Sequence, residues 1–536
     1  MFKSIKKKNQ EILENYKSAK SSDFDFERIK LLFSHVDKSS FHQVISNRIF
    51  QDLDIEELFM YMDRTCSKIG QQYLYFTLRT IPKINNRVQH FEKIIRYLNE
   101  NTEIKESIVL ELNKLNNPGA YFLQRLIYGN NIAKPRWFWI IPMLSGSCIA
   151  TLILSFWYPV FLILLSIVSI NFLLHYWNKN NILTYSNSIP QLLLLEQVVN
   201  KMIRSGVILD NTIQKSVDEI NKITRSAIFF KWESKMTSEI GQLADFLLEL
   251  LKAALLVEPI LIFKIIEKLE LKKREIEDLF TAVAQVDVAL SISSFRESLP
   301  YYIKPDLDKN GKLFNIKEVY HPLISNPVAN NLDLSNGKSV LISGSNMSGK
   351  TTFIRSVGIN VILAQTINTA CADEFVIPHL KVHSAIRIAD NLLNETSYYY
   401  EEVKIIKKMI DESEMEHQNL FLLDEIFKGT NTRERVASGK AVLSYLNENG
   451  NWVLASTHDL ELNEFLYKEY DFYHFEESLN NETLTFDFKL KDGNWLNTNA
   501  IRILEINKFP KVITEEAKTL AKEMKHLKRV SSTKHP

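Results

Sequence analysis

The sequence has few cysteines, few glycines and almost no net charge. Three cysteines (Cys66, Cys148 and Cys371) stand far apart in 536 residues, which excludes a disulfide scaffold and a zinc ribbon. Lys plus Arg number 65 and Asp plus Glu 64, so there is no general basic field, and nucleic-acid binding has to be argued from local patches. Glycine is scarce at 15 residues, whereas Phe reaches 31 and Tyr 20, which favours long helices with large cores.

Charged residues are absent from the 42 residues between Arg136 and Lys179, which contain no Asp, Glu, Lys or Arg. A bilayer core about 30 Å thick needs about 20 helical residues, so the stretch has the length of two spans. Trp and Tyr side chains occur at its start, middle and end, as is typical of the two headgroup zones. We therefore expect a two-helix transmembrane hairpin within 134–180, with spans at about 137–156 and 160–177.

Basic residues flank this hairpin: Lys134, Arg136 and Lys179. Since positive charge favours the cytoplasmic side, both ends are expected there. The prediction is an inner-membrane (cytoplasmic-membrane) protein with two spans, with the lipid bilayer as a partner and the remaining domains in the cytoplasm. The alternative is a buried helical hairpin inside a folded domain, because Ser145, Gly146, Ser147, Thr151 and Asn171 are tolerated in either setting.

In the rest of the chain the predicted secondary structure changes once, from all-helical to alternating strands and helices. Apolar residues recur at helical spacing in residues 1–133 and again in 181–308. From 309 to 527 short β runs alternate with helical stretches, which indicates an α/β sheet of parallel type. Residues 528–536 form a basic tail.

The first motif that carries chemistry is Gly344, four residues, then Gly349-Lys350-Thr351, placed between a β run and a helical pattern. Glycines let the backbone wrap a phosphate, and amide groups at a helix N-terminus point at the anion. Lys350 is expected to reach the β- and γ-phosphates, and the Thr351 hydroxyl to ligate Mg²⁺. The motif predicts nucleotide binding.

Two further strand ends bring acid and base groups. "NLFLL" runs into Asp424-Glu425, where Asp424 is predicted to hold Mg²⁺ and Glu425 to take a proton from the attacking water. "WVLAS" runs into Thr457-His458, and His458 is predicted to contact the γ-phosphate or that water. An acidic strand-to-helix turn and a structural histidine are the alternative interpretations.

Thr396-Ser397 precede a helical pattern. They fit an N-cap, whose side-chain oxygen accepts from free N–H groups. They also fit a helix start that meets the γ-phosphate of a partner subunit, and both interpretations are compatible.

Together these motifs resemble the MutS family of DNA mismatch-repair ATPases. "GSNMSGKTT" is similar to the family's phosphate loop, "LLDEIFKGTNT" to its Asp-Glu strand, "ASTHDLEL" to its Thr-His switch, and "VYHPLI" to the segment beside the nucleotide base. "MDRTCSKIG" resembles the start of its helical core. The resemblance implies a nucleotide site formed by His321, Gly344, Ser345, Asn346, Met347, Ser348, Gly349, Lys350, Thr351 and Thr352.

The resemblance implies a long-helix core and lever domain, here interrupted by the expected transmembrane hairpin, followed by a C-terminal P-loop NTPase domain of MutS/ABC type. It further implies ATP and Mg²⁺ as cofactors, catalysis by Lys350, Glu425 and His458, and a homodimer in which Thr396 and Ser397 act in trans. The sequence departs from the family in five ways. About 45 residues precede the core, so no mismatch-reading domain is expected, and the apolar stretch interrupts the helical core. In addition, Tyr320 replaces the usual Arg before His-Pro, Ser348 replaces a Gly of the phosphate loop, and Phe427-Lys428 replace a common Gly-Arg.

Three functions remain open. The first is a membrane-tethered MutS-like ATPase coupled to DNA, and the second is an ATP-driven membrane switch that acts on a protein partner with no DNA role. The third, an ABC-type transporter component, is disfavoured, because no Leu-Ser-Gly-Gly-Gln sequence lies between Lys350 and Asp424.

Overall fold

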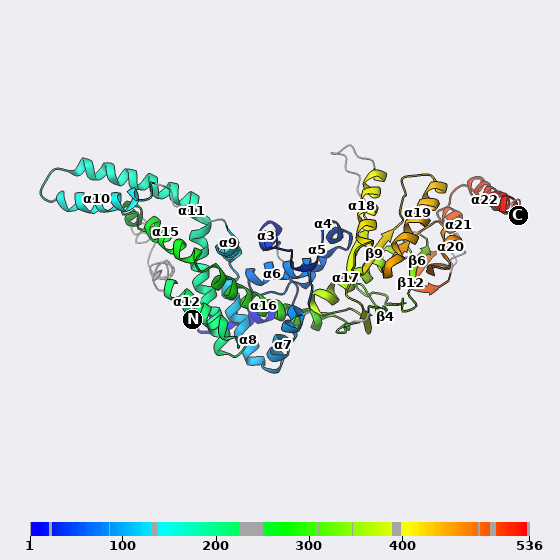
Figure 1. The fold of residues 1–536 in the computed structure, drawn as a ribbon, viewed down its shortest axis with the longest axis horizontal. Helices are drawn as coiled ribbons and strands as arrows, with labels where there is room; N and C mark the ends of the chain where they lie inside the picture. The colour runs from blue at the N-terminus through cyan, green and yellow to red at the C-terminus, as the bar shows by residue number, and fades with distance from the viewer. Residues whose placement is uncertain are drawn as a thin grey trace. The chain divides into compact units, whose positions relative to one another are not determined.

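The computed structural model of the chain divides into two compact units. The helical unit comprises residues 1–41 and 59–298, and the sheet unit comprises residues 42–58 and 299–536 (Figure 1). Segment 42–58 thus belongs to the sheet unit, although the chain on both sides of it belongs to the helical unit. The structure describes residues 2–20, 24–84, 86–129, 137–224, 250–308, 311–345, 347–387, 398–480, 483–493 and 500–532.

The helical unit is organised around its longest buried helix, α16 (Lys273–Ser298). Most side chains of α16 are buried, and the helix packs against α6, α7, α9 and α12. The elements of this unit are α1 (Phe2–Asn15), α2 (Phe26–Ile29), α3 (Leu31–His35), α6 (Lys68–Arg79), β2 (Thr80–Pro82), α7 (Asn86–Glu100), α8 (Thr102–Leu112), α9 (Gln124–Tyr128), α10 (Ile140–Leu154), α11 (Phe161–Arg204), α12 (Asn211–Thr224), α15 (Val257–Glu270) and α16. Helix α5 (Ile55–Met62) lies where the chain passes from one unit to the other.

The start of α6 is fixed by a buried carboxylate of α16. Asp287 accepts hydrogen bonds from the backbone N–H groups of Cys66 (2.7 Å) and Ser67 (2.8 Å), and Ser67 Oγ in turn accepts from Gly70 N at 2.9 Å. A Cβ atom on Gly70 would lie 2.1 Å from Asp287 Oδ2. The close approach of the two helices therefore requires glycine at position 70.

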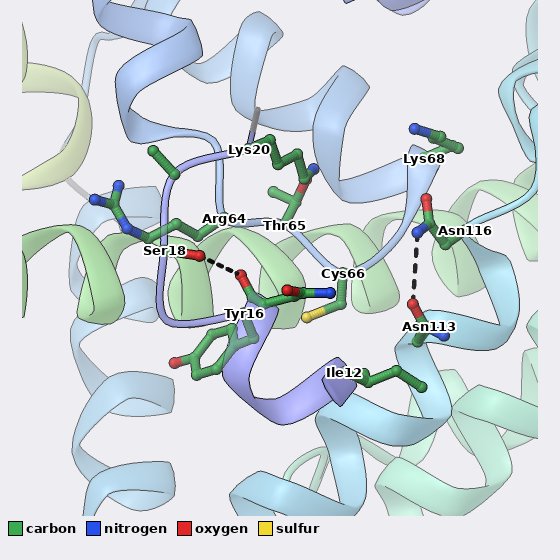
Figure 2. Close-up of a pocket in the computed structure, with 12 residues that line it drawn as sticks. Ile12, Tyr16, Ser18, Lys20, Arg64, Thr65, Cys66, Lys68, Asn113 and Asn116 are labelled. Atoms are coloured by element: carbon green, nitrogen blue, oxygen red, sulfur yellow. Dashed lines mark hydrogen bonds between the residues drawn. The ribbon is translucent and has the colours of Figure 1, made fainter. Parts of the chain in front are cut away.

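A polar cavity of about 330 Å³ lies next to this loop, between the end of α1 and residues 64–68 (Figure 2). Lys20 Nζ donates to both carboxylate oxygens of Asp63 (2.9 and 3.0 Å) and to Thr65 Oγ1 (2.9 Å). Thr65 Oγ1 also donates to Asp63 at 2.6 Å. Figure 2 shows Lys20 above Thr65, with Arg64 and Lys68 on opposite sides of the view. The Asp-x-Thr sequence therefore serves to fix the loop that leads into α6.

The predicted transmembrane hairpin is wrong. Among the described residues only one helix is long and apolar enough to cross a membrane, and it is α16, whose apolar stretch is 83% buried as a core helix. Helix α10 has 15 residues, which corresponds to about 22 Å and falls short of a bilayer core of about 30 Å. The apolar part of α11 ends at Trp177, but the helix continues to Arg204 without a break.

The two apolar helices instead pack against each other and against α15. Ser145 Oγ donates to Leu255 O and Asn171 Nδ2 to Ala254 O, each at 2.7 Å, in the turn before α15. Apolar side chains nevertheless remain exposed, both beside the helices, as at Trp139 and Phe156, and within them, as at Leu152 and Leu173. Hydropathy alone does not distinguish this packing from insertion into lipid, and neither a bilayer partner nor a membrane location has support in these helices.

The described residues of the sheet unit form two sheets of four or more strands. The larger has the strand order β12-β11-β6-β10-β9-β8, in which only the β11–β12 pair is antiparallel, and the smaller has the order β3-β7-β4-β5. The elements are β1 (Phe41–Val44), α4 (Asn47–Asp52), β3 (Asp306–Leu307), β4 (Asn315–Val319), β5 (Asn330–Asp333), β6 (Ser339–Gly344), α17 (Lys350–Ile367), β7 (Glu374–Ile377), β8 (Lys381–Ala385), α18 (Tyr398–Ser413), β9 (Asn419–Asp424), α19 (Thr432–Leu446), β10 (Trp452–Ser456), α20 (Glu461–Leu466), β11 (Tyr470–Asn480), β12 (Thr483–Asp492), α21 (Ala500–Ile506) and α22 (Lys511–Ser532).

Helices cover both faces of the larger sheet, so its central strands are apolar throughout. On β9, Leu422 lies against Gly358 of α17, whereas Phe421 and Leu423 belong to a core cluster with Ile406 and other residues of α18 and α19. The alternation of side chains along the strand thus separates the phosphate-loop helix from α18 and α19.

Segment 42–58 completes the edge of this sheet. Strand β8 is the last in the order, and its Val382 exchanges two hydrogen bonds with the side-chain amide of Gln43 (2.6 and 2.9 Å). Asp52 is buried and accepts from Ser384 Oγ at 2.7 Å and from Arg387 N at 3.0 Å. Polar side chains of segment 42–58 therefore form hydrogen bonds with backbone N–H and C=O groups that an edge strand otherwise leaves unpaired.

Candidate functional site

The phosphate loop connects β6 to α17. Gly344 has φ 146° and Gly349 has φ 110°, conformations that favour glycine. A Cβ atom on Gly344 would lie 2.8 Å from Phe475 O. Ser348 Oγ donates to Ser345 O at 2.8 Å and closes the turn, and Met347 is 84% exposed. Asn346 lies outside the described residues.

Lys350 is buried at the first position of α17. Its Nζ donates to Gly344 O and Ser345 O, both at 2.8 Å, so the ammonium lies inside the loop. Burial lowers its pKa, whereas the nearby carboxylates of Glu425, Asp424 and Glu477 act in the opposite direction. A loop of this form, closed around a cation at a helix N-terminus, is suited to hold phosphate oxygens.

Thr351 and Asp424 meet beside this loop. Thr351 Oγ1 donates to Asp424 Oδ2 at 2.7 Å, and Ser456 Oγ donates to the other carboxylate oxygen. Ser456 is opposite Asp424 in the parallel register of β9 and β10. Oxygen donors of this kind suit Mg²⁺, which is usually bound by one or two protein groups together with substrate phosphates. The described residues contain no group of three or more His, Cys, Asp or Glu side chains that could hold a metal alone.

Glu425 lies next to Asp424 and has two nitrogen-bearing side chains, those of His458 and Lys428, as partners. His458 Nε2 is 2.9 Å from Glu425 Oε1, and Lys428 Nζ is 2.8 Å from Oε2. Burial by itself raises the pKa of Glu425, but the hydrogen bonds from His458 and Lys428 outweigh it and lower the pKa to about 2. The carboxylate is therefore ionised at neutral pH, as a proton acceptor must be.

A second cavity of about 300 Å³ adjoins the start of α17. Thr352 and the rings of His321, Phe353, Phe475 and Phe488 line it. Burial lowers the pKa of His321 to about 4, and His321 Nδ1 accepts a hydrogen bond from Leu323 N at 3.3 Å. The cavity thus offers neutral, flat side chains, which suit a nucleotide base.

The structure brings most of the predicted residues together in one region. The phosphate loop, the Thr351–Asp424 pair and the Glu425–His458 pair are adjacent, whereas Thr396 and Ser397 lie outside the described residues and their role in trans stays a prediction. The sequence analysis assigned no site role to Lys428, Ser456 or Glu477, and it named Lys428 only as a departure from the family. Ser456 could have been predicted, since it ends a strand parallel to β9, whereas Glu477 has no sequence signal.

Comparison with known proteins identifies this region. Residues 340–525 match the family model of MutS domain V. That match takes in the phosphate loop, the Asp424-Glu425 strand end and His458.

Curated relatives support the same assignment over a larger part of the chain. DNA mismatch repair protein MutS of Listeria welshimeri is 27% identical over 306 residues, which cover 55% of this chain and 35% of the relative. MutS of Halalkalibacterium halodurans is 28% identical over 309 residues, covering 56% and 35%, and MutS of Aquifex pyrophilus is 29% identical over 232 residues, covering 42% and 27%. The match therefore spans about a third of these relatives' length.

Proposed function

The chain belongs to the MutS family, and from this premise we propose that it is an ATPase that binds ATP with Mg²⁺ and hydrolyses it within a homodimer coupled to DNA. Proteins of this family are ATPases. The observation that carries the proposal is the Thr351–Asp424 hydrogen bond of 2.7 Å with Glu425 directly beside it. This arrangement combines a site for a metal-bound phosphate with a charged proton acceptor.

Each side chain of the site has a distinct role in the proposed reaction. Lys350 stabilises negative charge on the β- and γ-phosphates, and Thr351 and Asp424 would hold Mg²⁺, which supplies Lewis-acid charge stabilisation when bound. Glu425 accepts the proton of a water molecule as its oxygen bonds to the γ-phosphorus and the bond to the ADP oxygen breaks. His458 would orient Glu425, to which it is bonded at 2.9 Å, and would contact the γ-phosphate or the attacking water.

We propose that the functional assembly is a homodimer in which the segment with Thr396 and Ser397 completes the partner's nucleotide site. The argument is the placement of this segment directly before α18, because the free N–H groups of a helix start attract phosphate. Turnover per chain should then rise with protein concentration. A rate per chain that is constant from dilute monomer to dimer contradicts a composite site.

DNA is the partner class that the family suggests, since the matched relatives are named DNA mismatch repair proteins. The near-neutral composition requires a local basic surface for such binding. An alternative is an ATP switch that acts on a protein partner and not on DNA. DNA affinity that falls steeply with salt supports the first function, and an ATPase rate that no DNA changes supports the second.

One experiment tests both parts of the proposal. The full chain is purified and its phosphate release from ATP is measured alone and with duplex, mismatched and branched DNA. The Lys350→Ala variant serves as the control for contaminating ATPases, because it removes the cation of the phosphate loop. Absence of ATP binding in the parent chain contradicts the proposed function.

A further inference from the structure

A glutamate of α18 is fully buried against the catalytic loop. Glu402 Oε1 accepts a hydrogen bond from the backbone N–H of Phe427 at 2.5 Å, and Glu402 is 0% exposed. Its second oxygen, Oε2, has no hydrogen-bond partner among the described residues. Burial raises the pKa of Glu402, against the opposing effects of the Phe427 N–H and of Lys428. Burial of an acid costs free energy unless the acid makes a specific contact, and here that contact is the Phe427 N–H.

The hydrogen bond from Phe427 N–H to Glu402 holds a segment whose backbone conformation is strained. Glu425 has φ 52° and Phe427 has φ 61°, so two residues of the same short segment adopt the left-handed conformation without being glycine. Side chains disfavour this conformation, and it persists where the surroundings fix it. The segment lies directly after β9 and contains the proposed proton acceptor.

Further contacts between α18 and this segment support the same arrangement. The rings of Tyr399 and Phe427 have centroids 6.1 Å apart. Ile406 and Met409 of α18 share a core cluster with Ile426 and Phe427. Helix α18 thus holds the segment through one hydrogen bond and an apolar contact, and the hydrogen bond is the directional part.

We propose that Glu402 is a positioning residue that fixes the backbone of Phe427 and thereby the place of Glu425 in the site. The hydrogen bond joins α18, which begins at Tyr398, to the segment that holds Glu425. This inference rests on the proposed function and names a residue that positions its proton acceptor.

The test compares three variants of the full chain. Glu402→Ala removes the acceptor, and Glu402→Gln keeps a side-chain oxygen at the same place. Glu401→Ala changes the neighbouring glutamate, which forms an ion pair with Lys404 at 2.9 Å on the helix surface. Glu402→Ala should lower kcat by about tenfold or more, because misplaced catalytic groups lose rate steeply. ATP affinity, measured with a fluorescent ATP analogue, should stay within about threefold, since the phosphate loop is untouched. Glu402→Gln should restore most of kcat, and Glu401→Ala should match the parent.

A second readout does not depend on activity. Hydrogen exchange of peptides that contain Phe427 should accelerate in Glu402→Ala and remain as in the parent in Glu402→Gln and Glu401→Ala, because only the first loses the acceptor of the Phe427 N–H. Equal loss of kcat in Glu402→Ala and Glu402→Gln, or unchanged exchange at Phe427 in Glu402→Ala, overturns the proposal. A parent chain without ATPase activity contradicts the proposed function instead, and the exchange measurement still decides the role of Glu402.

Discussion

His458 Nε2 lies 2.9 Å from Glu425 Oε1, although 32 residues separate the two in the sequence. Both residues follow neighbouring parallel strands, β9 and β10, whose ends lie at the same edge of the sheet. The contact keeps Glu425 ionised in spite of its burial, with a pKa of about 2. The structure thus presents a charged acceptor beside the phosphate loop before any proton transfer begins.

Glu425→Gln should retain ATP binding and lose turnover. Glutamine has nearly the same shape but cannot accept a proton at neutral pH, so kcat should fall by about 100-fold or more. Affinity for ATP should change little, because the phosphate loop is unaltered. Glu464→Gln, at an exposed position of α20, is the matched control. Turnover that survives in Glu425→Gln means that another group accepts the proton.

The Thr351 hydroxyl should set the requirement for Mg²⁺. Thr351→Ala removes the group that donates to Asp424 at 2.7 Å, whereas Thr351→Ser retains a hydroxyl. We expect Thr351→Ala to need about tenfold more Mg²⁺ for half-maximal phosphate release, and Thr351→Ser to resemble the parent. Removal of divalent metal by a chelator should abolish hydrolysis in all three proteins. Hydrolysis that persists in excess chelator contradicts the metal assignment.

The sequence predicted which strand ends meet, because motif spacing and the geometry of parallel strands depend on local patterns. Lys350, Thr351, Asp424, Glu425 and His458 were all singled out in this way and lie close together in the structure, and their catalytic roles stay predictions. Contacts between residues that are far apart in the sequence and belong to no motif could not be predicted. Glu402 reaches Phe427 only because α18 packs against the segment after β9, and no spacing encodes that.

The prediction of a transmembrane hairpin was wrong for a different physical reason. A stretch without charged residues indicates that its side chains favour an apolar environment. It does not indicate whether lipid or protein provides that environment. In the structure Ser145 and Asn171 bond to carbonyl groups of the turn before α15. The 15-residue length of α10 argues against a membrane-spanning helix. The sequence left this length uncertain, because α10 has no side-chain cap that marks its ends.

Gly70→Ala should destabilise the helical unit. The added methyl group would lie 2.1 Å from Asp287 Oδ2, so the buried carboxylate has to move from the N–H groups of Cys66 and Ser67. We expect a loss of about 1–3 kcal/mol in the free energy of unfolding, measured by denaturant titration. Gly146→Ala is the matched control, since no atom lies within 4 Å of its added Cβ and alanine favours helix by about 0.5–1 kcal/mol. Equal stability of the two variants contradicts the predicted clash.

Asp54→Asn should weaken the attachment of segment 42–58 to the sheet unit. Asp54 forms ion pairs with Arg355 of α17 at 2.9 Å and with Arg387 at 2.6 Å, and its side chain is 19% exposed. Asparagine tolerates the φ of 50° at this position, so the change removes charge without adding backbone strain. The free energy of unfolding should fall by about 1–3 kcal/mol. Asp411→Asn, which breaks an exposed pair with Lys407, should cost less than about 0.5 kcal/mol.

Acid should destabilise the sheet unit through two buried histidines. Burial lowers the pKa of His321 and of His383 to about 4, and the value in an unfolded chain is about 6.5. Between these values the unfolded chain binds protons that the folded chain does not, so stability is lost as the pH falls from about 6.5 towards 4.

The contribution of His383 can be isolated by substitution. Its Nε2 lies 3.0 Å from Asn419 Oδ1, and glutamine at position 383 keeps a donor for that oxygen but does not titrate. Between pH 7 and 5 the parent should lose on the order of 1–2 kcal/mol more stability than His383→Gln, measured by denaturant titration at each pH. The same pH dependence in both proteins would show that the ring of His383 takes up its proton as readily when folded as when unfolded.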